Sequence, residues 1–200
     1  GIIKNDNFEF EVKNTTKIFG THYLHIGKVT KGSCKLNDSV EATINVERRE
    51  LIKCNHSSTH LLHAALRSVL GNHVTQKGSL VNSQKLRFDF SHNNPIESEQ
   101  ILTIETLVNE QIKKNNTVKI KIIDQKKAIA EGAMALFGEK YTNEVRVVTM
   151  GEENGNYFSK ELCGGTHVSK LGEINKFKII SQSSVASGIR RIEAVSNISV

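Results

Sequence analysis

One segment, CNHSSTHLLHAALRSVLG at residues 54–71, constrains the fold more than any other part of the chain. Drawn as a helix with about 100° per residue, it gathers six apolar side chains on one arc, enough to bury the helix against a core. These side chains are Leu61, Leu62, Ala65, Leu66, Val69 and Leu70. Asn55 can cap the start of this helix, and Gly71 can end it. The segment therefore predicts an amphipathic helix packed on a core.

The same helix carries a second face that is not apolar. His56, His60, His63 and Arg67 fall within roughly 60° of one another on a helical projection, away from the apolar arc. A solvated polar face would show this pattern, and so would a face that holds a ligand. The helix alone does not decide between these two interpretations.

A second short segment, ELCGGTHV, places Cys163 and His167 four positions apart with two glycines between them. Because Gly-Gly does not sustain a helix, we expect a tight loop whose backbone can approach a ligand closely. With His56 and His60, the loop offers three imidazoles and one thiolate, a set that suits Zn²⁺. A chain of this length can build a core without metal, so the long gap between the pairs favours a functional pocket over a structural finger. The alternative is a merely buried or reduced thiol at Cys163.

The helix argues against one class of zinc enzyme. Positions 57–59 are Ser-Ser-Thr, so the segment lacks the glutamate that serves zincin peptidases as general base in His-Glu-x-x-His. A general zinc hydrolase acting on small esters or peptides is therefore disfavoured.

The number of cysteines and the hydropathy of the chain indicate its cellular compartment. Its three cysteines, Cys34, Cys54 and Cys163, are odd in number and widely spread, which argues against a disulfide framework. Cys34 and Cys54 are expected to be structural. Hydrophobic residues make up 38% of the chain, and no apolar run approaches the roughly 18 residues that suggest a membrane span. No signal peptide opens the chain. We expect a cytoplasmic protein without a membrane partner.

The net charge of +6 is concentrated in one stretch. The segment QIKKNNTVKIKIIDQKK, residues 111–127, contains six lysines and one aspartate. Clustered lysines release counterions from a nucleic-acid backbone, so Lys113, Lys114, Lys119 and Lys121 are candidates for a track of phosphate contacts. A solvated charged face is the alternative.

The pattern of the chain changes near residue 48. Residues 1–48 contain short alternating segments and glycines at turn-like spacing, which predicts a small β-barrel. Residues 49–200 mix helices and strands without strict alternation, which favours an α+β fold with a mainly antiparallel sheet. Beyond the histidine helix we expect a hairpin over 73–90, helices near 97–114 and 125–131, and strands at 118–123, 145–150, 175–181 and 189–195.

Four motifs carry a resemblance to a known family. They are NHSSTHLLHAALRSVLGNHVTQKGSLVNSQKLRFDFSH, GAMALFGEKY, ELCGGTHVSKLGEI and GIRRIEAV. In order and spacing they resemble the editing domain of bacterial alanyl-tRNA synthetase, over about residues 48–196. Freestanding alanyl-tRNA editing proteins and, more distantly, the threonyl-tRNA synthetase editing domain share the two metal pairs. Nothing in the chain resembles the aminoacylation domain of the ATP-dependent ligase. One departure is MGEENGNYFSKELCGG, which is a few residues longer before the cysteine than the family pattern.

The resemblance implies an activity and assigns roles to residues. The implied reaction is hydrolysis of the ester of tRNA(Ala) mischarged with serine or glycine, at a zinc site formed by His56, His60, Cys163 and His167. Gln76 would orient the attacking water or the substrate, and the Thr59 hydroxyl could contact a serine side chain. His63 and Arg67 are expected to be outer or solvent groups. The alternatives are a noncatalytic zinc-stabilised tRNA-binding module and a freestanding trans-editing deacylase.

Overall fold

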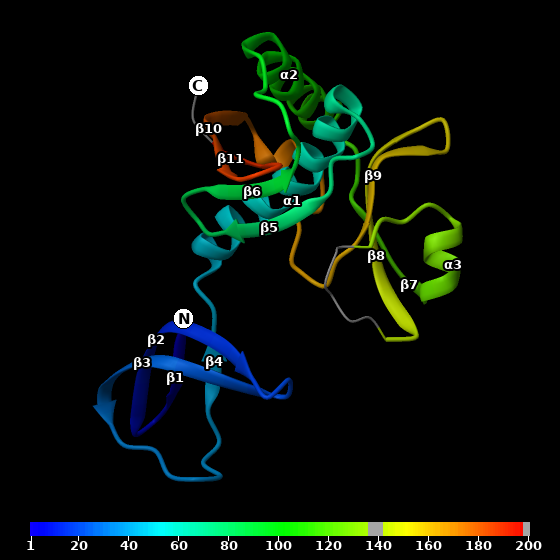
Figure 1. Ribbon diagram of the computed structural model, residues 1–200. Coiled ribbons are helices and arrows are strands. Elements are labelled where there is room, and N and C mark those ends of the chain that lie inside the picture. Colours follow the sequence, from blue (N-terminus) through cyan, green and yellow to red (C-terminus); the bar gives the residue numbers. More distant parts are fainter. Residues whose placement is uncertain (136–141, 198–200) are drawn as a thin grey trace. The chain divides into compact units, whose positions relative to one another are not determined.

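The computed structural model describes residues 1–135 and 142–197 (Figure 1). Most of the motif GAMALFGEKY, residues 136–141, therefore lies outside the described residues. The chain divides into two compact units, Gly1–Arg49 and Glu50–Val200. Within the described part, no helix is both long and apolar enough to cross a membrane.

The first unit is a four-stranded antiparallel sheet in the order β3-β2-β1-β4. Its strands are β1 (Ile2–Asn5), β2 (Phe8–Ile18), β3 (His22–Gly32) and β4 (Glu41–Thr43). The expected small barrel is not confirmed, because β3 and β4 stand at opposite edges and no pairing joins them among residues 1–49. With three residues, β4 is too short to pair along the eleven-residue β3, so the sheet stays open.

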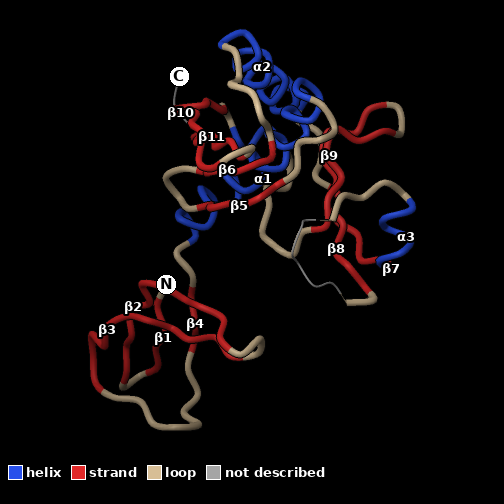
Figure 2. Tube along the Cα trace, in the orientation of Figure 1, coloured by secondary structure: helices blue, strands red, loops and turns tan. Residues whose placement is uncertain are grey.

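The second unit is mixed α+β, with helices and strands interspersed (Figure 2). Its strand pairs are antiparallel. One sheet has the order β10-β11-β6-β5, and the other has the order β7-β8-β9. The helices are α1 (Val46–Leu70), α2 (Ser98–Lys114), α3 (Gln125–Ala130) and a short 3₁₀ turn, η1 (Leu171–Ile174). The strands are β5 (Gln76–Val81), β6 (Leu86–Ser91), β7 (Lys119–Asp124), β8 (Glu144–Glu153), β9 (Asn156–Leu162), β10 (Phe177–Ala186) and β11 (Ile189–Ser196). The predicted α+β class with mainly antiparallel strands is confirmed.

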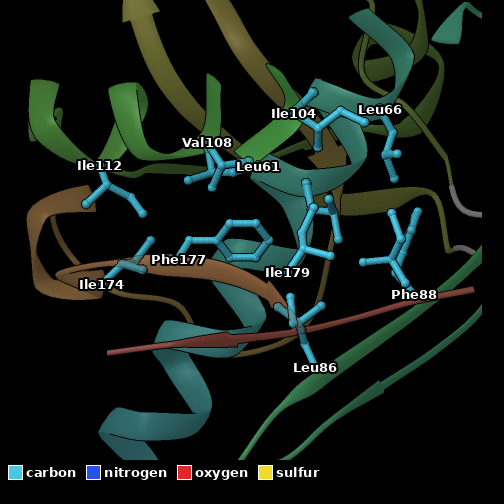
Figure 3. Packing of buried hydrophobic residues seen from close by; sticks show 14 of the residues in the cluster. Leu61, Leu66, Leu86, Phe88, Ile104, Val108, Ile112, Ile174, Phe177 and Ile179 are labelled. Atoms are coloured by element: carbon cyan, nitrogen blue, oxygen red, sulfur yellow. The ribbon is translucent and has the colours of Figure 1, made fainter. Parts of the chain in front are cut away.

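Helix α1 lies at the centre of the second unit. Its apolar residues, among them Leu61 and Leu66, pack with Phe88 of β6, Ile104 of α2 and Phe177 of β10 in one hydrophobic cluster (Figure 3). From Cys54 to Leu66 all but two side chains of the helix are buried. The helix is therefore enclosed on its polar side as well as on its apolar arc.

The start of α1 differs from the prediction. The helix begins at Val46, more than two turns before Asn55. Asn55 is not a cap, because its buried side chain donates to the carbonyl of Asn82 and accepts from the backbone and hydroxyl of Ser196. It ties α1 to β11 instead. The predicted end holds, since Gly71 follows the helix with a φ of +114°, which a residue with a side chain rarely adopts.

Candidate metal centre

Two segments that are distant in sequence meet at one point of the second unit. Successive turns of α1 place His56 and His60 on one helix face. The loop that follows β9 brings Cys163 and His167 to the same face. One ligand atom from each of these four residues lies within 4.8 Å of the others.

The imidazole rings are arranged around a common centre. The ring centroids of His56 and His167 are 4.3 Å apart. The ring centroid of His60 lies 5.1 Å from that of His56 and 5.0 Å from that of His167. The sulfur of Cys163 is 3.5 Å from Nε2 of His56. His60 and His167 are buried, so two of the four residues are removed from competing contacts with bulk water.

The Nδ1 atoms of the three histidines point away from this centre, toward partners outside it. Nδ1 of His56 lies 3.1 Å from the carbonyl of Thr166, and Nδ1 of His60 lies 2.7 Å from the carboxylate of Glu161. Nδ1 of His167 is 3.3 Å from the Ser57 hydroxyl. Among the described residues, the buried Nε2 atoms of His60 and His167 have no hydrogen-bond partner. In a histidine that binds a metal, one ring nitrogen faces the ion and the other is held by a hydrogen-bond partner outside the site. The histidines here have this arrangement, with Nδ1 held outside, and three imidazoles with one thiolate fit zinc.

The electrostatics of the metal-free site favour a thiolate. Burial raises the pKa of Cys163, but the neighbouring imidazoles of His167, His56 and His60 outweigh burial and lower it to about 3. Burial lowers the pKa of His60, but Glu161 and Cys163 outweigh burial and raise it to about 10. Burial, with charge on His60 and His56, lowers the pKa of His167 to about 4. The thiolate is the form of cysteine that binds a metal.

Two features fix the Gly-Gly loop. A Cβ atom at Gly165 would collide with the imidazole of His56, so this position requires glycine. The Arg146 guanidinium donates to the carbonyls of Cys163 and Gly165, at 2.8 and 2.6 Å. Gly164 has open space beside it and lines a pocket. The loop therefore holds its metal-facing residues firmly and leaves one side free for a ligand.

A pocket of about 480 Å³ opens beside the four residues. Its lining includes His56, Thr59, His60, Gln76, Ser79, Phe88, Glu161, Cys163, Gly164 and Gly165. The structure thus brings both sequence-predicted pocket residues, Gln76 and Thr59, to the metal cluster. The Thr59 hydroxyl donates to the carbonyl of Asn55 at 2.9 Å, so its oxygen remains an acceptor toward the pocket.

The lysine stretch does not contribute to the pocket lining. Lys114 forms an ion pair with Glu153 at 2.8 Å, and Lys119 pairs with Glu152. Lys113 and Lys121 are exposed. The two acidic partners lie near the tip of the β8–β9 hairpin, at the start of the longer segment before Cys163. That segment continues through β9, and its end, from Glu161 on, contributes to the pocket lining.

One buried group was not expected from the sequence, and the burial of another was left open. Glu161 is 1% exposed and accepts from both His60 and His63, yet nothing in the pattern KELC distinguishes it from a surface glutamate. Only its place two residues before Cys163, which in an extended segment puts both side chains on the same side, could have indicated it. His63, expected as an outer or solvent group, is 2% exposed. Arg67 donates to the carbonyls of Asn72 and Val74, away from the cluster.

The fold and the site define a class: an α+β domain with a histidine–cysteine cluster that could hold a metal ion, beside an open pocket. Residues 145–193 match the family model described as the threonyl and alanyl tRNA synthetase second additional domain. The resemblance drawn from the sequence is therefore confirmed over this stretch, which contains Cys163 and His167. The match supports an editing-related role connected with tRNA.

Proposed function

We propose that this chain is a zinc-dependent deacylase that hydrolyses the ester of tRNA(Ala) mischarged with serine or glycine. One observation carries the proposal: the four ligand atoms lie within 4.8 Å of one another, and three of the four residues, His56, His60 and Cys163, line a pocket that Gln76 and Thr59 also line. Four protein ligands would fill a tetrahedral zinc, as in a structural site, so it is the adjoining pocket and not an open coordination position that favours a functional role.

The substrate class follows from what an alanine-specific synthetase cannot exclude. A pocket sized for alanine discriminates against glycine by only about 1–3 kcal/mol, since one methyl group is missing. Serine differs from alanine by one hydroxyl and is also poorly rejected. A second site that hydrolyses the wrong esters would correct both errors.

The residues divide the work of ester hydrolysis. His56, His60, Cys163 and His167 would hold zinc, which when bound supplies a Lewis acid for the ester end of the substrate. Gln76 carries an amide that can both donate and accept, so it would orient the attacking water against the carbonyl. Arg146 keeps the Cys163–Gly165 loop in place. No glutamate lies between His56 and His60 to transfer a proton as in zincin peptidases, because positions 57–59 are Ser-Ser-Thr.

The direct test is deacylation of Ser-tRNA(Ala), Gly-tRNA(Ala) and Ala-tRNA(Ala) by the 200-residue chain. We expect hydrolysis of the first two substrates and little of the third. Gln76→Ala should slow hydrolysis by about 100-fold, the scale seen when one orienting donor is lost, with zinc content unchanged. Gln84→Ala, an exposed glutamine of the β5–β6 turn, is the matched control.

Other outcomes distinguish other functions. Tight tRNA binding without hydrolysis would indicate a noncatalytic zinc-stabilised module. Hydrolysis of small esters or peptides at rates similar to those for aminoacyl-tRNA would indicate a general zinc hydrolase. Either result would overturn the proposal.

A further inference from the structure

Glu161 links the candidate metal cluster to a fourth histidine, His63. Its carboxylate is buried between two turns of α1, with Oε2 2.7 Å from Nδ1 of His60 and Oε1 2.9 Å from Nδ1 of His63. Side chains alternate along a strand, so Glu161 and Cys163 extend from the β9 segment on the same side. Cys163 lies beside His56, and Glu161 lies beside His60 and His63, about one turn further along α1.

The geometry limits what this carboxylate can do. An ionised carboxylate only accepts hydrogen bonds, so both histidines must present Nδ1 as a donor. A neutral His60 with its proton on Nδ1 has a free electron pair on Nε2, the nitrogen that lies in the cluster. The choice of protonated nitrogen in His60 is therefore dictated by Glu161 and not by the metal.

We propose that Glu161 is a positioning residue of the metal centre, which holds the His60 ring with Nε2 toward the zinc while His63 anchors the opposite carboxylate oxygen. The proposal rests on the zinc site of the proposed function. It assigns a task to His63, whose ring is buried against Phe88 with centroids 5.1 Å apart and which is not one of the four cluster residues.

A competing role for a carboxylate in this pocket is that of general base. Against it, each oxygen of Glu161 already accepts an N–H hydrogen bond from a buried imidazole. A general base would need an oxygen directed at the water it deprotonates. The two roles predict different measurements: a positioning residue affects metal affinity, whereas a general base affects the rate with zinc still bound.

The first test is the affinity for Zn²⁺ alone, measured on the full chain by competition with a chromophoric chelator. Glutamine has one acceptor oxygen and one donor nitrogen, so Glu161→Gln can keep only one of the two histidines as an Nδ1 donor. We expect zinc affinity to fall about 10- to 100-fold, as for other partners of metal-binding histidines. Glu105→Gln is the matched control, because Glu105 is also largely buried and accepts from Lys178 and the Ile179 backbone, away from the site.

The second test uses His63 and does not depend on the folding of Glu161→Gln. His63→Asn keeps an N–H donor near the position of Nδ1, whereas His63→Phe keeps the ring and removes the donor. We expect His63→Phe to lose several-fold in zinc affinity and His63→Asn to stay close to the wild-type chain. Equal losses in both variants would overturn the anchoring role, because the shape of the ring and not its donor would then matter.

The outcomes separate this proposal from the proposed function. If the wild-type chain binds zinc and Glu161→Gln binds it equally well, Glu161 is not a positioning residue and the zinc site stands. If Glu161→Gln also loses hydrolysis while keeping zinc, Glu161 is a general base. If the wild-type chain binds no zinc, both proposals fail together.

Discussion

The sulfur of Cys163 lies 3.5 Å from Nε2 of His56, although 107 positions separate the two residues in the chain. The approach is made by packing, because α1 is enclosed by the hydrophobic cluster that also contains residues of β6, α2 and β10. The Ser57 hydroxyl joins the same segments by accepting the Val168 N–H at 3.2 Å. Apolar packing and the Ser57 hydrogen bond therefore bring the two halves of the cluster together.

The first prediction concerns metal content and metal removal. We expect about one zinc per chain, and a large loss of zinc in His60→Ala and Cys163→Ala. Chelation should leave the far-ultraviolet circular dichroism and a cooperative thermal transition in place, because the apolar core persists without metal. Cys34→Ala, at an exposed cysteine outside the cluster, should keep its zinc. Elemental analysis that finds no zinc in the wild-type chain would refute the site.

The four cluster residues were predictable from the sequence, whereas the buried groups around them and the open first sheet were not. Helical spacing and the pair Cys163–His167 were sufficient to identify the four cluster residues, because ligand types and turn chemistry are local properties. The burial of His63 and Glu161 was not predictable, since it depends on how β9 packs against α1. The open first sheet was missed for a similar reason: alternation predicts strands but does not specify which edges pair.

The second prediction concerns selectivity at Thr59. Because its hydroxyl donates to Asn55, the oxygen can accept from the hydroxyl of a bound serine side chain, which glycine lacks. Thr59→Val should lower the ratio of seryl- to glycyl-tRNA hydrolysis rates by about fivefold, the value of one hydrogen bond of about 1 kcal/mol. Thr103→Val is the matched control, since Thr103 makes the same bond to the carbonyl four residues earlier in α2. An equal fall in both rates would show that serine is recognised elsewhere.

The third prediction concerns the lysines. If Lys113 and Lys121 contact phosphates, replacing both with Gln should weaken tRNA binding and reduce the slope of log affinity against log salt by about one to two. Lys114 and Lys119 already pair with Glu153 and Glu152, so the same double replacement there should have a smaller effect. Binding isotherms at several salt concentrations measure both slopes. Identical slopes in the wild-type chain and in both double variants would show that these lysines form a solvated charged face and not a track of phosphate contacts.

The fourth prediction concerns the pH dependence of the metal-free chain. The pKa of Cys163 is lowered from 9.0 to about 3, so its stabilisation is present above pH 9 and is lost as the pH falls toward 3. The pKa of His60 is raised from 6.5 to about 10, so its stabilisation is present below pH 6.5 and is lost as the pH rises through 10. Between pH 6.5 and 9 the two changes offset each other.

The free energy of unfolding of the metal-free chain should therefore contain a contribution from this pair that is flat from about pH 6.5 to 9 and declines on both sides. Cys163→Ser removes the thiolate, so the difference between wild type and variant should shrink as the pH falls from about 9 toward 3. Urea unfolding of chelated protein at several pH values measures this difference. A difference that stays constant from pH 8 to pH 4 would contradict a thiolate beside His60.

The central claim, that hydrolysis depends on zinc at this cluster, is tested most directly by one titration. Chelated, metal-free chain is titrated with Zn²⁺ while the rate of seryl-tRNA(Ala) hydrolysis is followed. We expect the rate to rise linearly and to level off at one zinc per chain, and we expect no such rise in Cys163→Ser. A metal-free chain that hydrolyses seryl-tRNA(Ala) as fast as the zinc-loaded chain would contradict the claim.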